Sequence, residues 1–123
     1  MKSTFLGLRT VGFKVPDLEA AKQWYTKVLG VEPYFDQPFY VGFNVAGYEL
    51  GLQPDEQHAS DKTNSVVTYW GVENVAATFA ELIELGAATL EEPMDVGEGI
   101  VVASVKDPWG NAFGVIYNPH FNL

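Results

Sequence analysis

Cysteine is absent from this chain, which excludes a disulfide framework and a thiolate metal site. Histidine occurs only twice, at His58 and His120, and an isolated histidine in a polar segment is usually solvated rather than a metal ligand. Long apolar runs are also missing: none approaches the roughly 18 residues that cross a membrane as a helix. Residues 1–7 are too short and too soon charged for a signal peptide, so we expect a cytoplasmic protein.

Basic residues are scarce as well. Seven Lys and Arg stand against 16 Asp and Glu, which gives a formal net charge of −9. This charge argues against nucleic acid and against an anionic membrane as partners. Residues 63–123 hold one basic and eight acidic residues, a net charge of −7, whereas residues 1–62 hold six and eight, a net charge of −2. Two interpretations stay open: a solvated acidic surface, or a field that attracts a cationic small molecule.

Apolar residues are plentiful. Of 123 residues, 47% are hydrophobic and 14% are aromatic, which is enough for a packed interior. This length suits one small domain, residues 1–123, made of two half-size units. Residues 106–117 are the most informative stretch, because they predict a strand, a tight turn and a second strand. Pro108 fixes φ at one corner of that turn, Gly110 provides a positive φ at the next, and apolar side chains then alternate at Phe113, Val115 and Tyr117.

The chain contains an internal repeat. Residues 10–21 resemble residues 67–78, and Val15 corresponds to Val72 at an offset of 57 residues. Each copy is an apolar strand followed by an N-cap residue, Asp17 or Asn74, and then by a helix.

Both expected helices carry an apolar face and end at a glycine. Gly30 and Gly86 each follow a leucine and are typical left-handed helix terminators. The apolar residues at helical spacing are Leu18, Ala21, Tyr25, Val28 and Leu29 in the first helix, and Val75, Phe79, Leu82 and Ile83 in the second.

Three strand-like segments follow each helix, so each half is expected to be a βαβββ unit. The segments are 32–35, 40–45 and 48–53 in the first half, and 89–93, 99–105 and 112–117 in the second. The segment 94–98, which is acidic and contains a glycine, predicts a longer hairpin loop. The two modules, about residues 6–53 and 65–118, are joined by a polar linker, residues 54–64. We therefore expect an α+β fold in which two βαβββ repeats form a curved mixed sheet around a groove, with the helices outside.

Three features together resemble the vicinal oxygen chelate superfamily, which includes glyoxalase I, bleomycin resistance proteins, fosfomycin-modifying enzymes and extradiol dioxygenases. They are the opening strand and helix at residues 11–30, the paired βαβββ units, and the Asp-Pro-Trp-Gly-Asn turn at residues 107–111. The resemblance covers about residues 6–118. It is specific for the fold and weak for function, because one fold hosts many chemistries.

Enzymes of this family hold a divalent metal through His, Gln or Glu on the first and last strands of each half. The resemblance places these four positions at Thr10, Gly51, Val67 and Gly114. Such side chains offer one weak hydroxyl and no charge, so we expect no metal and no other cofactor. A shift of one residue would bring Glu49 into the groove, but a single carboxylate is too little for a metal site.

Strand parity predicts the groove lining, because alternate residues of a strand share a face. Aromatic side chains at Phe39, Tyr40, Trp70 and Trp109 are candidates for the rim, and packing in the core is the alternative for each of them. The predicted ligand-binding residues are Thr10, Lys14, Tyr40, Glu49, Gly51, Val67, Tyr69, Trp109, Gly114 and Ile116.

The first hypothesis is a metal-free small-molecule binding protein of the glyoxalase/bleomycin-resistance type. The resemblance implies one concrete form of this hypothesis: bleomycin resistance proteins share the fold and sequester a cationic drug by ring stacking and by charge attraction. The alternative is a superfamily enzyme of the lyase or dioxygenase type, with a relocated or absent metal, that acts on a small metabolite. A third hypothesis is a scaffold that works through protein contacts. The resemblance also implies a homodimer, with the modules paired within one chain or exchanged between two.

Overall fold

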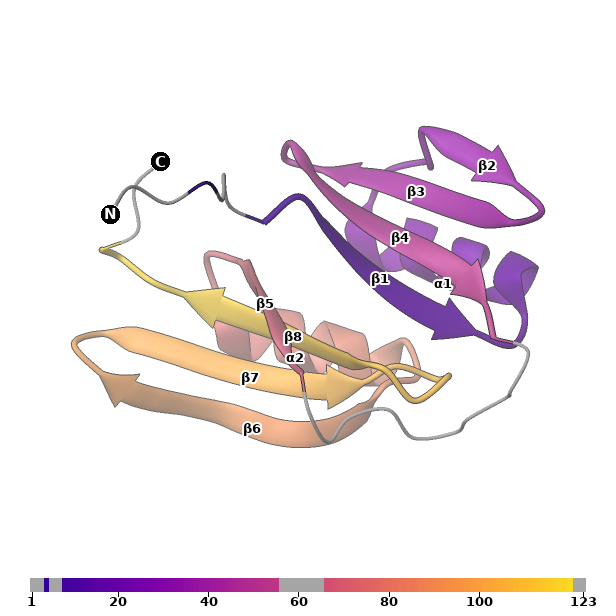
Figure 1. Ribbon diagram of the computed structural model, residues 1–123. Coiled ribbons are helices and arrows are strands. Elements are labelled where there is room, and N and C mark those ends of the chain that lie inside the picture. The colour runs from indigo at the N-terminus through magenta and orange to yellow at the C-terminus, as the bar shows by residue number, and fades with distance from the viewer. Residues whose placement is uncertain (1–3, 5–7, 56–65, 121–123) are drawn as a thin grey trace. The chain divides into compact units, whose positions relative to one another are not determined.

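A computed structural model describes residues 4, 8–55 and 66–120. The chain divides into two compact units, Met1–His58 and Ala59–Leu123, coloured indigo to magenta and pink to yellow in Figure 1. Within the described residues, each unit has one helix and one four-stranded mixed sheet, in the order β, α, β, β, β. The α+β class and the two βαβββ units are confirmed.

The first unit pairs its first strand with its last. Its sheet has the order β1-β4-β3-β2, in which β1 runs parallel to β4 and the other pairs are antiparallel. The elements are β1 (Thr10–Val15), α1 (Leu18–Leu29), β2 (Phe35–Gln37), β3 (Tyr40–Val45) and β4 (Tyr48–Pro54).

The second unit repeats this topology. Its sheet has the order β5-β8-β7-β6, in which β5 runs parallel to β8 and the other pairs are antiparallel. The elements are β5 (Thr68–Gly71), α2 (Val75–Glu84), β6 (Ala88–Gly97), β7 (Ile100–Lys106) and β8 (Ala112–Tyr117).

The helix ends form as the sequence predicts. The Asp17 and Asn74 side chains each accept a backbone N–H three residues later, at 3.0 Å, and so cap α1 and α2. Gly30 and Gly86 follow the helices with φ of 72° and 109°, a region that favours glycine. The described helices include none long and apolar enough to cross a membrane.

One face of each sheet packs against its helix and the opposite face carries the polar residues. In β1, Phe13 and Val15 are buried on the α1 side, whereas Thr10 and Lys14 are exposed. The same alternation buries a core in each unit: Ala21, Tyr25, Val41, Phe43, Leu50 and Leu52 in the first, and Val75, Leu82, Ala103, Val105, Phe113 and Val115 in the second. We call the sheet face opposite the helix the distal face of each unit.

The expected loop at residues 94–98 is wrong. Strand β6 continues to Gly97, and the chain turns only through Gly97, Glu98 and Gly99, all with positive φ. Pro93 lacks a backbone donor, yet the strand tolerates it, because β6 is an edge strand and its register shifts between Glu91 and Met94. Strand β2 also begins later than the expected 32–35, at Phe35.

The turn at residues 107–111 is held by a buried carboxylate. Asp107 Oδ1 accepts the backbone N–H groups of Trp109 at 2.9 Å and of Asn111 at 2.8 Å. The Asn111 side-chain amide donates to Asp107 Oδ2 at 3.1 Å. Gly110 adopts a φ of 91°, as the turn requires. These bonds fix the connection between β7 and β8.

Candidate functional site

The distal face of the first unit carries a carboxylate surrounded by hydroxyl groups. Thr10 is the register partner of Glu49 across the β1–β4 pair, and its Oγ1 donates to Glu49 Oε1 at 2.8 Å. The Tyr34 hydroxyl donates to Glu49 Oε2, and the Tyr40 side chain lies close enough to Glu49 to lower the pKa of its carboxyl group. We call Thr10, Tyr34, Tyr40 and Glu49 the Glu49 cluster.

The pKa values in this cluster move apart. The hydrogen bond from Tyr34 lowers the pKa of Glu49 and outweighs the opposing effect of burial, with help from Thr10 and Tyr40. Burial, followed by the bond to Glu49, raises the pKa of Tyr40 to about 12. The bond to Glu49 also raises the pKa of Tyr34. At neutral pH the carboxylate is therefore charged and the phenols are neutral.

A row of three glycines makes room for this cluster. Gly12, Gly51 and Gly42 are register partners on β1, β4 and β3. A Cβ on Gly51 would overlap the Tyr40 hydroxyl and come within 2.5 Å of Tyr40 Cζ. A Cβ on Gly42 would come within 3.0 Å of the Tyr34 ring and 2.8 Å of Glu49 Oε2. The two tyrosines thus lie across the glycine row.

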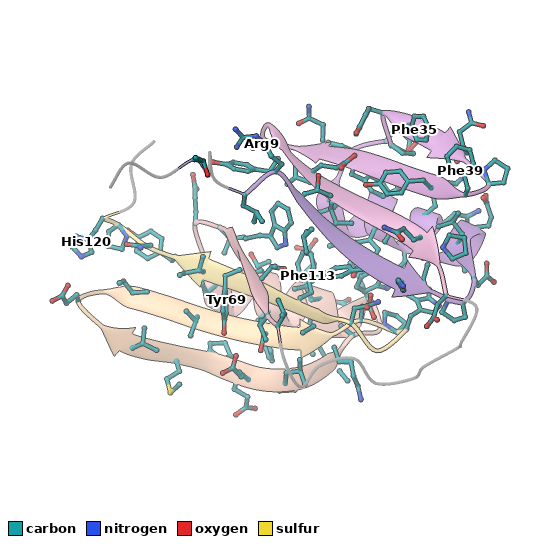
Figure 2. The ribbon with its side chains drawn as sticks, in the orientation of Figure 1. Arg9, Phe35, Phe39, Tyr69, Phe113 and His120 are labelled. Atoms are coloured by element: carbon teal, nitrogen blue, oxygen red, sulfur yellow. The ribbon has the colours of Figure 1, made fainter. Side chains whose placement is uncertain are left out.

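Aromatic rings extend the site towards the β2–β3 hairpin. The Phe35 centroid lies 6.0 Å from that of Phe39 and 6.1 Å from that of Tyr40, and Figure 2 shows Phe35 and Phe39 together on this hairpin. Both are exposed, Phe39 to 66%. Phe35 and Tyr34 were missed by sequence reasoning, although paired aromatics on both sides of a short polar turn were a usable signal.

The second unit carries a similar arrangement. The hydroxyls of Tyr69 and Ser104 donate to Glu91 Oε1 at 2.9 and 2.8 Å. Tyr69, Gly114, Ser104 and Glu91 are consecutive register partners across β5, β8, β7 and β6. A Cβ on Gly114 would come within 2.6 Å of the Tyr69 ring. Burial, followed by the bond to Glu91, raises the pKa of Tyr69.

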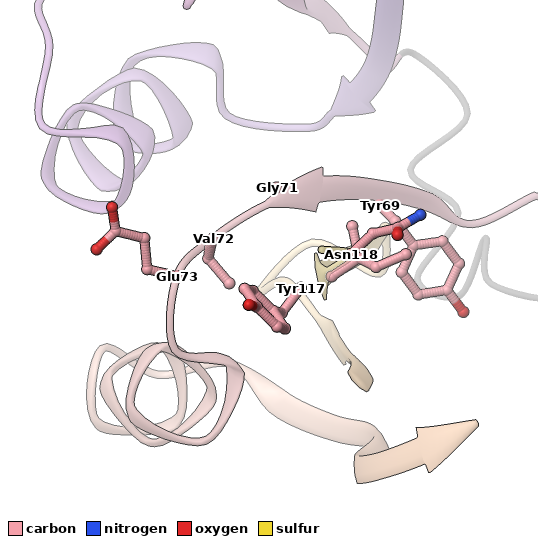
Figure 3. Close-up of a pocket in the computed structure, with 7 residues that line it drawn as sticks. Tyr69, Gly71, Val72, Glu73, Tyr117 and Asn118 are labelled. Carbon is pink, nitrogen blue, oxygen red and sulfur yellow. The ribbon is translucent and has the colours of Figure 1, made fainter. Parts of the chain in front are cut away.

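A pocket of about 550 Å³ lies where β5 and β8 end. Its size falls in the range of small-molecule sites. In Figure 3, Glu73 lies at one end of the row of labelled lining residues and Tyr69 at the other. The lining residues are Tyr69, Gly71, Val72, Glu73, Ile116, Tyr117 and Asn118.

Within each unit, the structure brings several of the predicted ligand-binding residues together. Thr10, Tyr40, Glu49 and Gly51 meet in the Glu49 cluster or directly beneath it, and Lys14 lies on the same face two residues beyond Gly12. In the second unit, Tyr69 and Ile116 line the pocket and Gly114 lies under Tyr69. Val67 lies just before β5 and is half-buried.

The two tryptophans that were candidates for a groove rim lie in different surroundings. Trp70 is the register partner of Val115 on the helix side, and its ring stacks on Phe113 at 6.4 Å. Its ring nitrogen has no hydrogen-bond partner among the described residues. Trp109 lies in the Asp107 turn and is half-buried. For Trp70 the core-packing alternative holds, because strand parity turns its side chain towards the helix.

The residues present do not fit the family's metal. The four corresponding positions, Thr10, Gly51, Val67 and Gly114, offer a single hydroxyl, and that hydroxyl donates to Glu49. In the part of the chain that the structure describes, no three His, Cys, Asp or Glu side chains gather as a metal site. The His120 ring nitrogen contacts the Glu98 carbonyl at 2.9 Å, and His58 lies outside the described residues.

Comparison with known proteins identifies the family and the fold of this chain. A family model described as Glyoxalase/Bleomycin resistance protein/Dioxygenase superfamily matches residues 7–115. No curated protein matches the chain. Three solved structures share the fold, as their TM-scores show.

The first is a glyoxalase-related enzyme from Fulvimarina pelagi, with a TM-score of 0.80 and 20% identity over 97% of this chain and 93% of that chain. The second is a glyoxalase/bleomycin resistance protein/dioxygenase family enzyme from Burkholderia phytofirmans PsJN, with a TM-score of 0.76 and 18% identity over 91% and 98%. The third is a protein from Agrobacterium tumefaciens, with a TM-score of 0.72 and 28% identity over 92% and 98%.

Proposed function

Because the chain belongs to the Glyoxalase/Bleomycin resistance protein/Dioxygenase superfamily, we propose that it is a metal-free small-molecule binding protein of the glyoxalase/bleomycin-resistance type. Its ligand is a small molecule with a cationic group and an aromatic ring. One observation carries this proposal: Glu49 is an anion held among tyrosine hydroxyls on the distal face of its sheet.

Charge and aromatic surface favour a cation at this site. A carboxylate attracts a cation, and the faces of neighbouring aromatic rings attract it further. Phe35 and Phe39 add exposed rings near Tyr40. The formal net charge of −9 also raises the local concentration of cations around the protein.

The pKa directions favour binding over acid–base catalysis. A general base works best when its pKa lies near the operating pH. Hydrogen bonds lower the pKa of Glu49, which moves it away from neutral pH. The pKa values of Tyr34 and Tyr40 are raised, which also moves them away from neutral pH. The cluster is thus built to keep one stable charge rather than to exchange protons.

The pocket at the ends of β5 and β8, in the second unit, suits a small and partly apolar molecule by itself. Ile116 and Val72 supply aliphatic surface, and Tyr69 and Tyr117 supply rings. Asn118 and Glu73 are polar groups that can orient a ligand. This pocket is a second surface on which the proposed binding can be tested by mutation.

The test compares three probes that have one benzene ring, similar size and different charge. Benzylammonium, benzyl alcohol and benzoate are titrated into the protein by calorimetry, and each is also tested for thermal stabilisation. We expect benzylammonium to bind most tightly and Glu49→Gln to abolish that preference. Glu32→Gln removes the same charge from an exposed position outside the cluster and should keep it. Equal binding of the three probes, or no binding, would contradict the proposal.

We also propose that the protein is a homodimer, as the resemblance implies. Size-exclusion chromatography with light scattering checks this directly. A monomer at all concentrations would rule out a dimer built by exchange of modules.

A further inference from the structure

Each carboxylate oxygen of Glu49 already accepts a hydrogen bond from a hydroxyl of the protein itself. A carboxylate has about four lone-pair sites for donors. Thr10 occupies one on Oε1 and Tyr34 occupies one on Oε2. A cationic donor that binds at the position of either hydroxyl must therefore replace that hydroxyl.

Only Tyr34 is placed to leave without disturbing the sheet. Thr10 lies within the β1–β4 ladder. Tyr40 is half-buried and its ring fills the space above Gly51. Tyr34 precedes β2 and its residue is 64% exposed, although its backbone N–H is fixed to the Gly42 carbonyl at 2.9 Å. Rotation of its side chain moves the ring into solvent and leaves that backbone bond intact.

We propose that the ligand group at Glu49 is a protonated amine that carries N–H donors, and that this ammonium replaces the Tyr34 hydroxyl on Oε2. The inference rests on the proposed function and narrows it from a cation in general to an ammonium with hydrogens. It makes Tyr34 the residue that sets the specificity of the site.

The requirement for N–H donors follows from the cost of an unmade hydrogen bond. When Tyr34 leaves, a partly buried carboxylate oxygen loses a charge-assisted hydrogen bond. A primary ammonium replaces that bond and adds attraction between opposite charges. A quaternary ammonium has the same charge but no N–H, so it cannot satisfy Oε2 and gains nothing from the departure of Tyr34.

The experiment uses two probes with the same ring and the same charge, benzylammonium, which has N–H donors, and benzyltrimethylammonium, which has N-methyl groups in their place. Affinities for wild type and Tyr34→Phe are measured by calorimetry. The variant keeps the ring and frees Oε2, so benzylammonium should bind it about tenfold more tightly than wild type. Benzyltrimethylammonium should bind the two proteins within about twofold of each other, because it does not compete for Oε2.

Tyr48→Phe is the matched control, since it removes a tyrosine hydroxyl from β4 outside the Glu49 cluster. It should leave both affinities unchanged, and circular dichroism melting should show that both variants fold. If benzylammonium binds wild type but binds Tyr34→Phe no more tightly, the inference is overturned and the proposed function stands. An equal gain for both probes also overturns it, because the gain then has no connection with N–H donors. If neither probe binds either protein, the inference and the cationic form of the proposed function fall together.

Discussion

The ring of Tyr40 occupies the space that a side chain on Gly51 would need. A Cβ at Gly51 would overlap the Tyr40 hydroxyl and lie 2.5 Å from Cζ, and Gly114 has the same relationship to Tyr69, with 2.6 Å to Cδ1. Both glycines stand where the family resemblance places metal ligands on the last strand of each unit. A tyrosine in this space and a long ligand side chain on the strand therefore exclude each other.

Gly51→Ala should destabilise the protein by about 1–3 kcal/mol, because the new methyl group forces Tyr40 out of its place. Urea denaturation checks this. Gly71→Ala is the matched control, since a Cβ there meets no described atom within 4 Å. We expect that control to be neutral or up to about 1 kcal/mol more stable. Equal losses in both variants would contradict the packing argument.

Glu49→Gln should change the pKa of Tyr34 more than the pKa of Tyr40. The bond to Glu49 is the largest cause of the raised pKa of Tyr34, so this pKa should fall towards 10 in the variant. Burial is the largest cause of the pKa of about 12 at Tyr40, so that value should remain raised. NMR of tyrosines labelled at Cζ measures both. A fall of equal size at the two residues would show that burial does not dominate at Tyr40.

Glu49 should also contribute stability that disappears in acid. Its pKa is lower in the folded protein than in the unfolded chain, where it is near 4.5. The unfolded state therefore binds more protons as the pH falls from that value, and the native state loses its advantage. The difference in unfolding free energy between wild type and Glu49→Gln should be constant above about pH 5.5 and shrink below about pH 4.5. Glu32→Gln, measured in parallel, reports the general effect of one negative charge.

Asp107→Ala should cost about 2–4 kcal/mol, because it leaves the buried N–H of Asn111 and the half-buried N–H of Trp109 without their acceptor. Asp95→Ala provides the comparison. Asp95 accepts one backbone N–H, that of Gly97 at 2.8 Å, but at an exposed turn where water replaces the lost bond. Its loss should stay below about 1 kcal/mol. Similar values for the two variants would mean that burial of the Asp107 carboxylate is unimportant.

Metal titration should give no stoichiometric binding. The chelator-treated, untagged protein is titrated with Mn, Ni, Zn and Fe(II) by calorimetry. Thr10 and Gly51 in the first unit, and Val67 and Gly114 in the second, supply too few donors for tight coordination. Tight binding at one equivalent would show that other residues have replaced these positions, and would favour the enzyme hypothesis.

Local patterns in the sequence predicted most elements well. Strands β3 and β8 match the expected ranges residue for residue, and Asp17 and Asn74 cap the helices as expected. Such features depend on neighbouring residues, through side-chain alternation and short-range hydrogen bonds. The misplaced feature depends on pairing instead: β6 extends past Pro93 because it is an edge strand whose register shifts there.

The sequence by itself determined the repeated βαβββ units, the helix caps, the Asp107 turn and the absence of metal-binding side chains at Thr10, Gly51, Val67 and Gly114. Only the tertiary structure decided that Tyr34, Tyr40 and Thr10 converge on Glu49, and that Tyr69 and Ser104 converge on Glu91. The reason is physical: composition and periodicity fix which face a residue takes along its own strand. Hydrogen bonds between side chains on different strands follow from register, and register is set only when the sheet is assembled.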